Sequence, residues 1–255
     1  MKLRNLYYLP VYWGTLLIFA AGGLEVSAVS LLFGWLPATD GTERCFQRFI
    51  HYHFRFFHEW CALVNLVQVR YDGWERIPAG GVVLVANHVS LIDVTCLIAN
   101  LPEALCIFKP AIRRNPVLGA GARRAGYLAS DGGQELVRRA VEKVGRGHTL
   151  LVFPEGTRSP GGGLSPFKPG FAAIARRAHA PVQLIRIATN SDMLTKGRPI
   201  LRLPIVPTRV TITVGPLLES EQYGRSEDLA QAVEGWYRGT PLGKPACPVG
   251  EPALS

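Results

Sequence analysis

Short apolar stretches alternate with amphipathic ones along most of this chain. Stretches rich in apolar and β-branched residues, short enough to be strands, occupy residues 67–71, 82–86, 105–108, 149–153, 182–187 and 209–214. Apolar positions at helical spacing occupy residues 94–101, 134–144, 172–178 and 227–237. Strands separated by helices predict an α/β fold, with a mainly parallel central sheet flanked by helices.

The N-terminal pattern is different. Residues 11–36 form an apolar run with one charge, Glu25. This run is too long for the hydrophobic segment of a signal peptide, so it favours a retained membrane element. Because Gly22 and Gly23 lie in its middle and basic residues lie on both sides, a helical hairpin that enters and leaves by the same face is favoured over a single span. A buried core helix is the alternative.

Residues 46–64 carry apolar side chains at spacings of three and four, which predicts a helix with an aromatic stripe. Such a stripe can lie at a lipid interface, but packing against the rest of the protein is favoured. We therefore divide the chain into membrane-associated N-terminal helices (residues 1–64), an α/β domain (residues 65–240) and a flexible Pro- and Gly-rich tail (residues 241–255).

Composition narrows the class of partner. The 255 residues carry a net charge of +9, and 48% of them are hydrophobic. A basic and apolar chain suits an anionic membrane surface or acidic substrates, and the absence of a nucleic-acid motif argues against nucleic acid. The five cysteines lack C-x-x-C pairing, so we expect reduced, mostly buried thiols and no metal site.

The first candidate for chemistry is VVLVANHVSLID, residues 82–93. His88 follows the predicted strand, and Ser90 with Asp93 has the spacing of a helix start. On one continuous helix His88 and Asp93 would point about 140° apart. If His88 lies in the loop and Asp93 in the helix, the imidazole can fold back over the carboxylate, as a general base and the group that orients it.

This stretch also has a purely structural interpretation. Asp93 could complete a capping box, and His88 could be a hydrogen-bonded histidine at a strand end. The stretch alone leaves the two interpretations open.

A second polar loop follows the predicted strand at residues 149–153. Its sequence is FPEGTRS, residues 153–159, which places a carboxylate, a glycine, a hydroxyl and a guanidinium together. In α/β proteins ligands bind where strands end. Glu155 could bind hydroxyl groups, and Arg158 has the planar fork that suits a phosphate or carboxylate. Taken alone, the loop could be a surface turn in which these two side chains pair.

Together, N-H-x4-D and F-P-E-G-T-R-S some sixty residues later resemble the glycerolipid acyltransferase family, typified by 1-acylglycerol-3-phosphate acyltransferases. The resemblance covers roughly residues 67–216. It implies transfer of an acyl group from acyl-CoA or acyl carrier protein to the hydroxyl of a lysolipid, without cofactor or metal, at the cytoplasmic face of the cytoplasmic (inner) membrane. By this resemblance His88 is the catalytic base and Asp93 holds its ring, while the acceptor is bound by Glu155, Gly156, Thr157 and Arg158.

The expected acceptor is 1-acylglycerol-3-phosphate, which would give phosphatidate in phospholipid biosynthesis. Two departures from the family pattern bear on it. Gly132 stands where the family usually has a further acceptor-binding arginine, and Leu184 replaces a proline. Other cations could bind the anion in its place, and the candidates are Lys109, Arg123 and Arg124. The alternative acceptor is a lysolipid without phosphate, such as a lyso-aminolipid, a glycolipid or a specialised lipid.

Two other functions compete with acyl transfer to a lipid. A thioester hydrolase would use water in place of the lipid alcohol. A non-catalytic membrane-binding protein would keep the fold as a scaffold and would not need His88. The acyltransferase interpretation is chemically sufficient, because a histidine near neutral pKa can take the hydroxyl proton as the thioester is attacked.

Overall fold

The computed structural model describes residues 3–158 and 164–239; the expected tail at residues 241–255 lies outside them. Seven strands form one sheet in the order β1-β7-β6-β2-β5-β3-β4. Only the β6–β7 pair is antiparallel. The strands are β1 (Val67–Asp72), β2 (Val83–Ala86), β3 (Ala104–Phe108), β4 (Leu128–Ala129), β5 (Thr149–Val152), β6 (Val182–Thr189) and β7 (Thr208–Leu218). The predicted mainly parallel α/β fold is confirmed.

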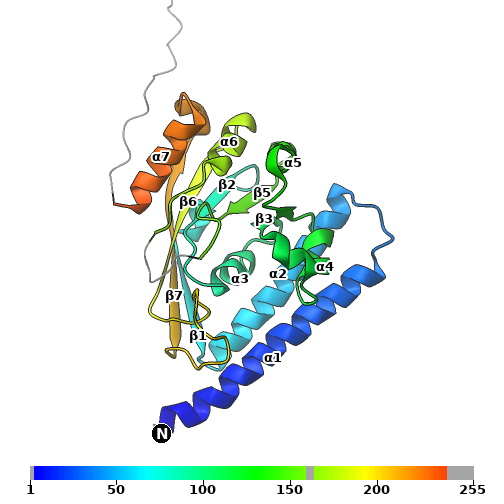
Figure 1. The fold of residues 1–255 in the computed structure, drawn as a ribbon, viewed down its shortest axis with the longest axis vertical. Coiled ribbons are helices and arrows are strands. Elements are labelled where there is room, and N and C mark those ends of the chain that lie inside the picture. Colours follow the sequence, from blue (N-terminus) through cyan, green and yellow to red (C-terminus); the bar gives the residue numbers. More distant parts are fainter. Residues whose placement is uncertain (1–2, 159–163, 240–255) are drawn as a thin grey trace, which may run out of the picture.

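Helices cover both faces of the sheet (Figure 1). On one face lie α1 (Leu3–Leu32), α2 (Asp40–Leu63), α3 (Ile92–Ile98) and α4 (Gly119–Arg124). On the other lie α5 (Gly133–Gly145), α6 (Gly170–Arg177) and α7 (Ser226–Tyr237). Short 3-10 turns at Trp74–Arg76, Pro110–Arg114 and Ser220–Gln222 link these elements.

The central strand β2 supplies both cores. Its side chains alternate, so that Leu84 and Ala86 join the core under α1, α2 and α3, while Val83 and Val85 join the core under α5, α6 and α7. All four are fully buried. A strand covered on both faces is apolar at every position, which explains the uninterrupted apolar run in the sequence.

The N-terminal apolar run is one continuous helix, and the turn expected near Gly22 and Gly23 is not there. α1 passes straight through both glycines, and the chain reverses only after Leu32, so α1 and α2 together form the hairpin (Figure 1). Gly23 serves packing instead. A Cβ on Gly23 would lie 2.1 Å from a methyl carbon of Val117, whereas one on Gly22 would make an ordinary contact with His53 at 3.7 Å. The missing side chain of Gly23 lets the segment at Val117 approach the helix closely.

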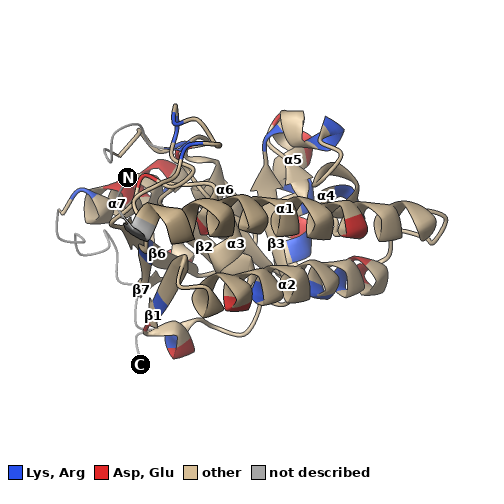
Figure 2. Cartoon of the chain, turned by 90° about the horizontal axis from the view of Figure 1, so that it is seen from below, with Lys and Arg blue, Asp and Glu red and all other residues tan. Residues whose placement is uncertain are grey.

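Helix α1 is long and apolar enough to cross a membrane, by length and composition, over residues 5–32. Most of its apolar window is not buried inside the protein. Glu25 is its one charged residue in that range, and α1 is almost free of charge in Figure 2. This helix indicates membrane association.

Helix α2 packs its aromatic stripe against the protein, as favoured from the sequence. Phe46, Ile50, Phe57 and Cys61 are buried in the core that α1 and the sheet share. The cysteines follow the expectation where they are described: Cys61, Cys96 and Cys106 are buried and Cys45 is exposed, while Cys247 lies outside the described residues.

Candidate active site

The two polar motifs lie side by side because they follow neighbouring strands. β2 and β5 are parallel, and Val85 is paired with Val152. His88 and Glu155 each come three residues after that pair. The two loops are joined directly, since the backbone N–H of His88 donates to Oε1 of Glu155 at 2.7 Å. The carboxyl ends of adjacent strands are where α/β sheets bind ligands.

The imidazole of His88 folds back onto Asp93. Nδ1 of His88 lies 3.1 Å from Oδ2 of Asp93, and both side chains are largely buried, with 13% and 1% of their surface exposed. Because an ionised carboxylate only accepts hydrogen bonds, Nδ1 carries the proton. Nε2 is then left with a lone pair, the form that a general base needs.

Asp93 serves the helix start as well as the histidine. Its Oδ2 also accepts hydrogen bonds from the backbone N–H groups of Val89 and Ser90, both at 2.7 Å. The Oγ of Ser90 accepts in turn from Ile92 N at 3.3 Å. The structural interpretation of this stretch and the chemical one therefore hold together, because one carboxylate fixes both the turn and the ring.

Two neighbours further fix the base. The ring of Phe153 lies against the imidazole of His88, with 4.4 Å between centroids. Asn87 pairs its side-chain amide with the backbone of Ile187 in β6, donating at 2.9 Å and accepting at 2.7 Å. These contacts restrain residues 87–93, which we call the histidine turn.

Glu155 joins backbone segments in this structure. Its Oε1 accepts from His88 N, and its Oε2 accepts from Ser165 N at 3.0 Å. The side chain is buried, at 4% exposed. Hydrogen bonds from backbone N–H groups satisfy a buried carboxylate, so Glu155 anchors the loop that carries Gly156 to the histidine turn.

Four cations meet around the remainder of this loop, and we call Lys109, Arg158, Lys168 and Lys196 the cation rim. Nζ of Lys109 donates to Oγ1 of Thr157 at 3.2 Å. Gly156 has a positive φ of 64°, and Nζ of Lys168 lies 3.2 Å from where its Cβ would be. A side chain at Gly156 would be strained and would press on that ammonium.

The cation rim is electrostatically unbalanced. Partial burial lowers the pKa of Lys109, and the charges of Arg158, Lys196 and Lys168 lower it further. Across residues 3–158 and 164–239, no carboxylate forms an ion pair with any of the four side chains. Clustered cations without counter-charges repel one another, and a bound anion relieves that repulsion.

The sequence pointed to only part of this rim. Lys109 and Arg158 are in it, whereas Lys168 and Lys196 were not singled out, since they lie far along the chain on the segments that follow β5 and β6. Arg123 and Arg124 point elsewhere. Arg123 donates to the carbonyl of Arg113 at 2.7 Å, and the guanidinium of Arg124 lies over the ring of Phe46 in α2, 5.2 Å from its centroid.

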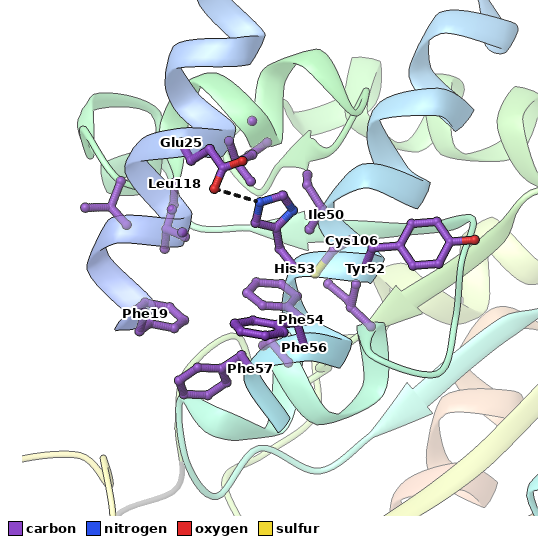
Figure 3. Close-up of a pocket in the computed structure, with 18 of the residues that line it drawn as sticks. Phe19, Glu25, Ile50, Tyr52, His53, Phe54, Phe56, Phe57, Cys106 and Leu118 are labelled. Carbon is purple, nitrogen blue, oxygen red and sulfur yellow. Dashed lines mark ion pairs between the residues drawn. The ribbon is translucent and has the colours of Figure 1, made fainter. Parts of the chain in front are cut away.

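An apolar cavity of about 580 Å³ lies beside the site, between α1, α2, α3 and α4. Figure 3 shows its aromatic wall, to which Phe19 and Phe57 contribute, and the one ion pair drawn in it, between Glu25 and His53. Val94, next to Asp93, and Phe108, next to Lys109, also line it. The cavity therefore shares α3 with Asp93 and β3 with the residue before Lys109, although its lining includes neither His88 nor any residue of the cation rim.

A comparison with protein families matches residues 68–209 of this chain to the model described as "Acyltransferase". The chain belongs to the acyltransferase family. The matched range contains both motif loops and the whole cation rim, and ends inside β7.

The chain is similar to several known lipid acyltransferases. A putative 1-acyl-sn-glycerol-3-phosphate acyltransferase of Caenorhabditis elegans is 28% identical, over 80% of this chain and 74% of its own length. The lyso-ornithine lipid O-acyltransferase of Pseudomonas aeruginosa is 32% identical, over 64% and 62%. The crystal structure of PlsC, the 1-acyl-sn-glycerophosphate acyltransferase from Thermotoga maritima, matches with a TM-score of 0.71 and 25% identity, over 93% and 95%.

Proposed function

We propose that this protein transfers an acyl chain from acyl-CoA or acyl carrier protein to the hydroxyl of 1-acylglycerol-3-phosphate, giving phosphatidate. The observation that carries the proposal is the contact between the His88 turn and the Glu155 loop beside an unbalanced group of cations. Acyltransferase family membership implies an acyl donor and a lipid acceptor.

The geometry of His88 supports a direct transfer. Nε2 takes the proton of the lipid hydroxyl as its oxygen attacks the thioester carbonyl carbon. The new C–O ester bond forms, the C–S bond breaks, and the thiol group leaves as a thiolate that can recover the proton from the imidazolium. Asp93 holds the ring in the required tautomer and stabilises its positive charge.

The cation rim supports an acceptor that carries a phosphate. Arg158 and three lysines offer several charge-assisted donors to one anion, and Arg158 is held from behind because its Nη1 donates to the carbonyl of Leu194 at 2.7 Å. Gly132 stands where the family usually has an acceptor-binding arginine. Lys168 and Lys196 supply positive charge in place of that arginine. A lysolipid without an anionic group would leave these charges without a partner.

The apolar cavity is proposed to hold an acyl chain during the reaction. Val94 on α3, the helix that carries Asp93, lines it, and each methylene buried in it contributes about 0.8 kcal/mol to binding. Because α1 indicates membrane association and basic residues lie on both sides of its apolar run, we place the site at the cytoplasmic face of the cytoplasmic membrane.

The experiment supplies purified full-length protein in mixed micelles with radiolabelled acyl-CoA and lysophosphatidate, lyso-ornithine lipid or no acceptor. We expect labelled phosphatidate, and a loss of at least about 10²-fold in kcat for His88→Ala. His179→Ala is the matched control, because this exposed histidine pairs with Glu221 on the surface. Circular dichroism and thermal melting check that both variants are folded.

Each other outcome assigns a different function. Labelled fatty acid released at the same rate without acceptor would identify a thioester hydrolase. Labelled ornithine lipid without phosphatidate would overturn the proposed acceptor but keep the reaction. Full activity of folded His88→Ala would overturn the catalytic role of His88.

A further inference from the structure

Exposed apolar side chains gather on one part of this molecule. Among the described residues, every large exposed hydrophobic side chain except Leu217 lies on α1 and the turn after it, on α2, at Leu91, or on the loop between β6 and β7. We call residues 190–207 the β6–β7 loop. Its members of this set are Ile200, Leu201 and Ile205, which are 53%, 59% and 54% exposed. Apolar patches that stay exposed mark surfaces for contact with proteins or membranes.

The β6–β7 loop holds an ion pair with one largely buried partner, while three of its aliphatic side chains are exposed. Asp192 and Arg198 form an ion pair in its interior, with only 11% of the Arg198 side chain exposed. Oδ1 of Asp192 accepts from Ile205 N at 3.0 Å, and Nη2 of Arg198 donates to Leu203 O at 2.6 Å. Three exposed aliphatic side chains on one loop are more than a loop facing water usually presents, and they indicate a contact surface.

This loop continues the apolar surface of α1. The hydroxyl of Tyr12, a buried side chain in the first half of α1, donates to the carbonyl of Ile200. Figure 1 shows the loop next to this half of the helix. Whatever medium surrounds the exposed side chains of α1, such as Leu9 and Trp13, therefore also reaches the tip of the loop.

The charges of the loop are those of a lipid interface. Lys196 and Arg202 are exposed, and the negative charge of Asp192 is neutralised by its ion pair with Arg198. Aliphatic side chains flanked by cations bind anionic bilayer surfaces, with the apolar groups among the acyl chains and the cations near the phosphates.

The same loop holds parts of the active site. The carbonyl of Leu194 accepts from Arg158 Nη1 at 2.7 Å and from Leu91 N at 3.3 Å. The hydroxyl of Ser90 donates to Met193 O at 2.6 Å. The depth to which the loop enters a bilayer would therefore set how far the cation rim and the histidine turn lie from the bilayer surface.

We infer that the β6–β7 loop is a second membrane-contact element, whose residues Ile200, Leu201 and Ile205 enter an anionic bilayer beside the first half of α1. The inference rests on the membrane association of α1, and not on the reaction proposed above. It places the active site where a lipid acceptor can reach the cation rim without leaving the membrane.

The test labels the full-length protein with a polarity-sensitive fluorophore on Leu201→Cys, in a background of Cys45→Ser and Cys247→Ser. The control is Leu217→Cys in the same background. Leu217 is also exposed, and it lies near the far end of β7, about 30 Å from the start of that strand at Thr208 at about 3.3 Å per strand residue. Vesicles contain phosphatidylcholine and phosphatidylglycerol, with or without nitroxide-labelled acyl chains.

On binding to vesicles, the label at position 201 should shift to the blue and lose at least half of its emission to nitroxide lipids, while the label at position 217 should change by less than a tenth. Sedimentation with the vesicles is measured on the same samples. A protein that sediments while its label at position 201 stays in water overturns the inference. A label that responds to an acidic acyl carrier protein and not to vesicles assigns the loop to a protein partner, which overturns it as well.

Discussion

Two groups of charged side chains in this protein show opposite ways of arranging charge. The first, which we call the α2–α5 clamp, joins Lys143 and Arg146 at the end of α5 to Asp40 and Glu43 at the start of α2. Its cations face carboxylates, and the hydrogen bond from Lys143 lowers the pKa of Asp40. The second, the cation rim, has four cations and, among the described residues, no carboxylate in an ion pair with them.

The difference separates a structural role from a binding role. In the clamp, Lys143 and Glu43 are largely buried and form an ion pair, with 2.5 Å between Nζ and Oε2. Such a pair fixes how α2 sits on the α/β domain. In the rim, Lys109, Lys168 and Lys196 are exposed and repel one another. A bound anion would offset this repulsion and stabilise the arrangement. Charge balance, more than the number of charges, distinguishes the two.

The largest effect should come from breaking the clamp. Lys143→Ala leaves Glu43 buried without its partner, and we expect a loss of about 3–5 kcal/mol in the free energy of unfolding, with the KM for the acceptor unchanged. Denaturant unfolding measures the first and steady-state kinetics the second. Arg139→Ala, an exposed neighbour on α5, should change stability by less than about 0.5 kcal/mol. Equal stability of Lys143→Ala and the parent would show that the clamp is not structural.

A smaller effect, on acceptor binding and not on stability, should follow from Lys168→Ala in the rim. Losing one charge-assisted contact should raise the KM for lysophosphatidate about tenfold, while the melting temperature stays the same or rises because repulsion is relieved. Arg177→Ala, exposed on α6, is the matched control. A fall in stability without a change in KM would place Lys168 with the structural charges.

The smallest effect should be seen with inorganic phosphate and no lipid. At ten times its Kd, phosphate should stabilise the parent by about 1.4 kcal/mol, a rise of about 4 °C in melting temperature. The rise should shrink in Lys168→Ala and remain in Lys143→Ala. Equal shifts in parent and Lys168→Ala, or equal shifts with chloride at the same ionic strength, would mean that the rim has no anion site.

Much of the fold was predictable because burial on both faces leaves a clear trace in sequence. The uninterrupted apolar run of β2 and the amphipathic pattern of α5 both predicted their elements within a few residues. Two short elements, β4 and α4, were missed, since two paired residues and a stretch of small residues carry no period. The continuity of α1 was also missed, because Gly22 and Gly23 favour a turn in isolation and only the contact of Gly23 with Val117 shows that it serves close packing.

By itself, the sequence determined the two polar loops and their chemistry, because a buried strand that stops at Asn87 or Phe153 must place the next polar residues at its carboxyl end. The tertiary structure decided which groups meet there. Parallel pairing of β2 with β5 joins Glu155 to the backbone of His88, and long-range folding brings Lys168 and Lys196 to the rim while packing turns Arg124 onto Phe46. Such contacts depend on distances between remote segments, and no local pattern of residues encodes them.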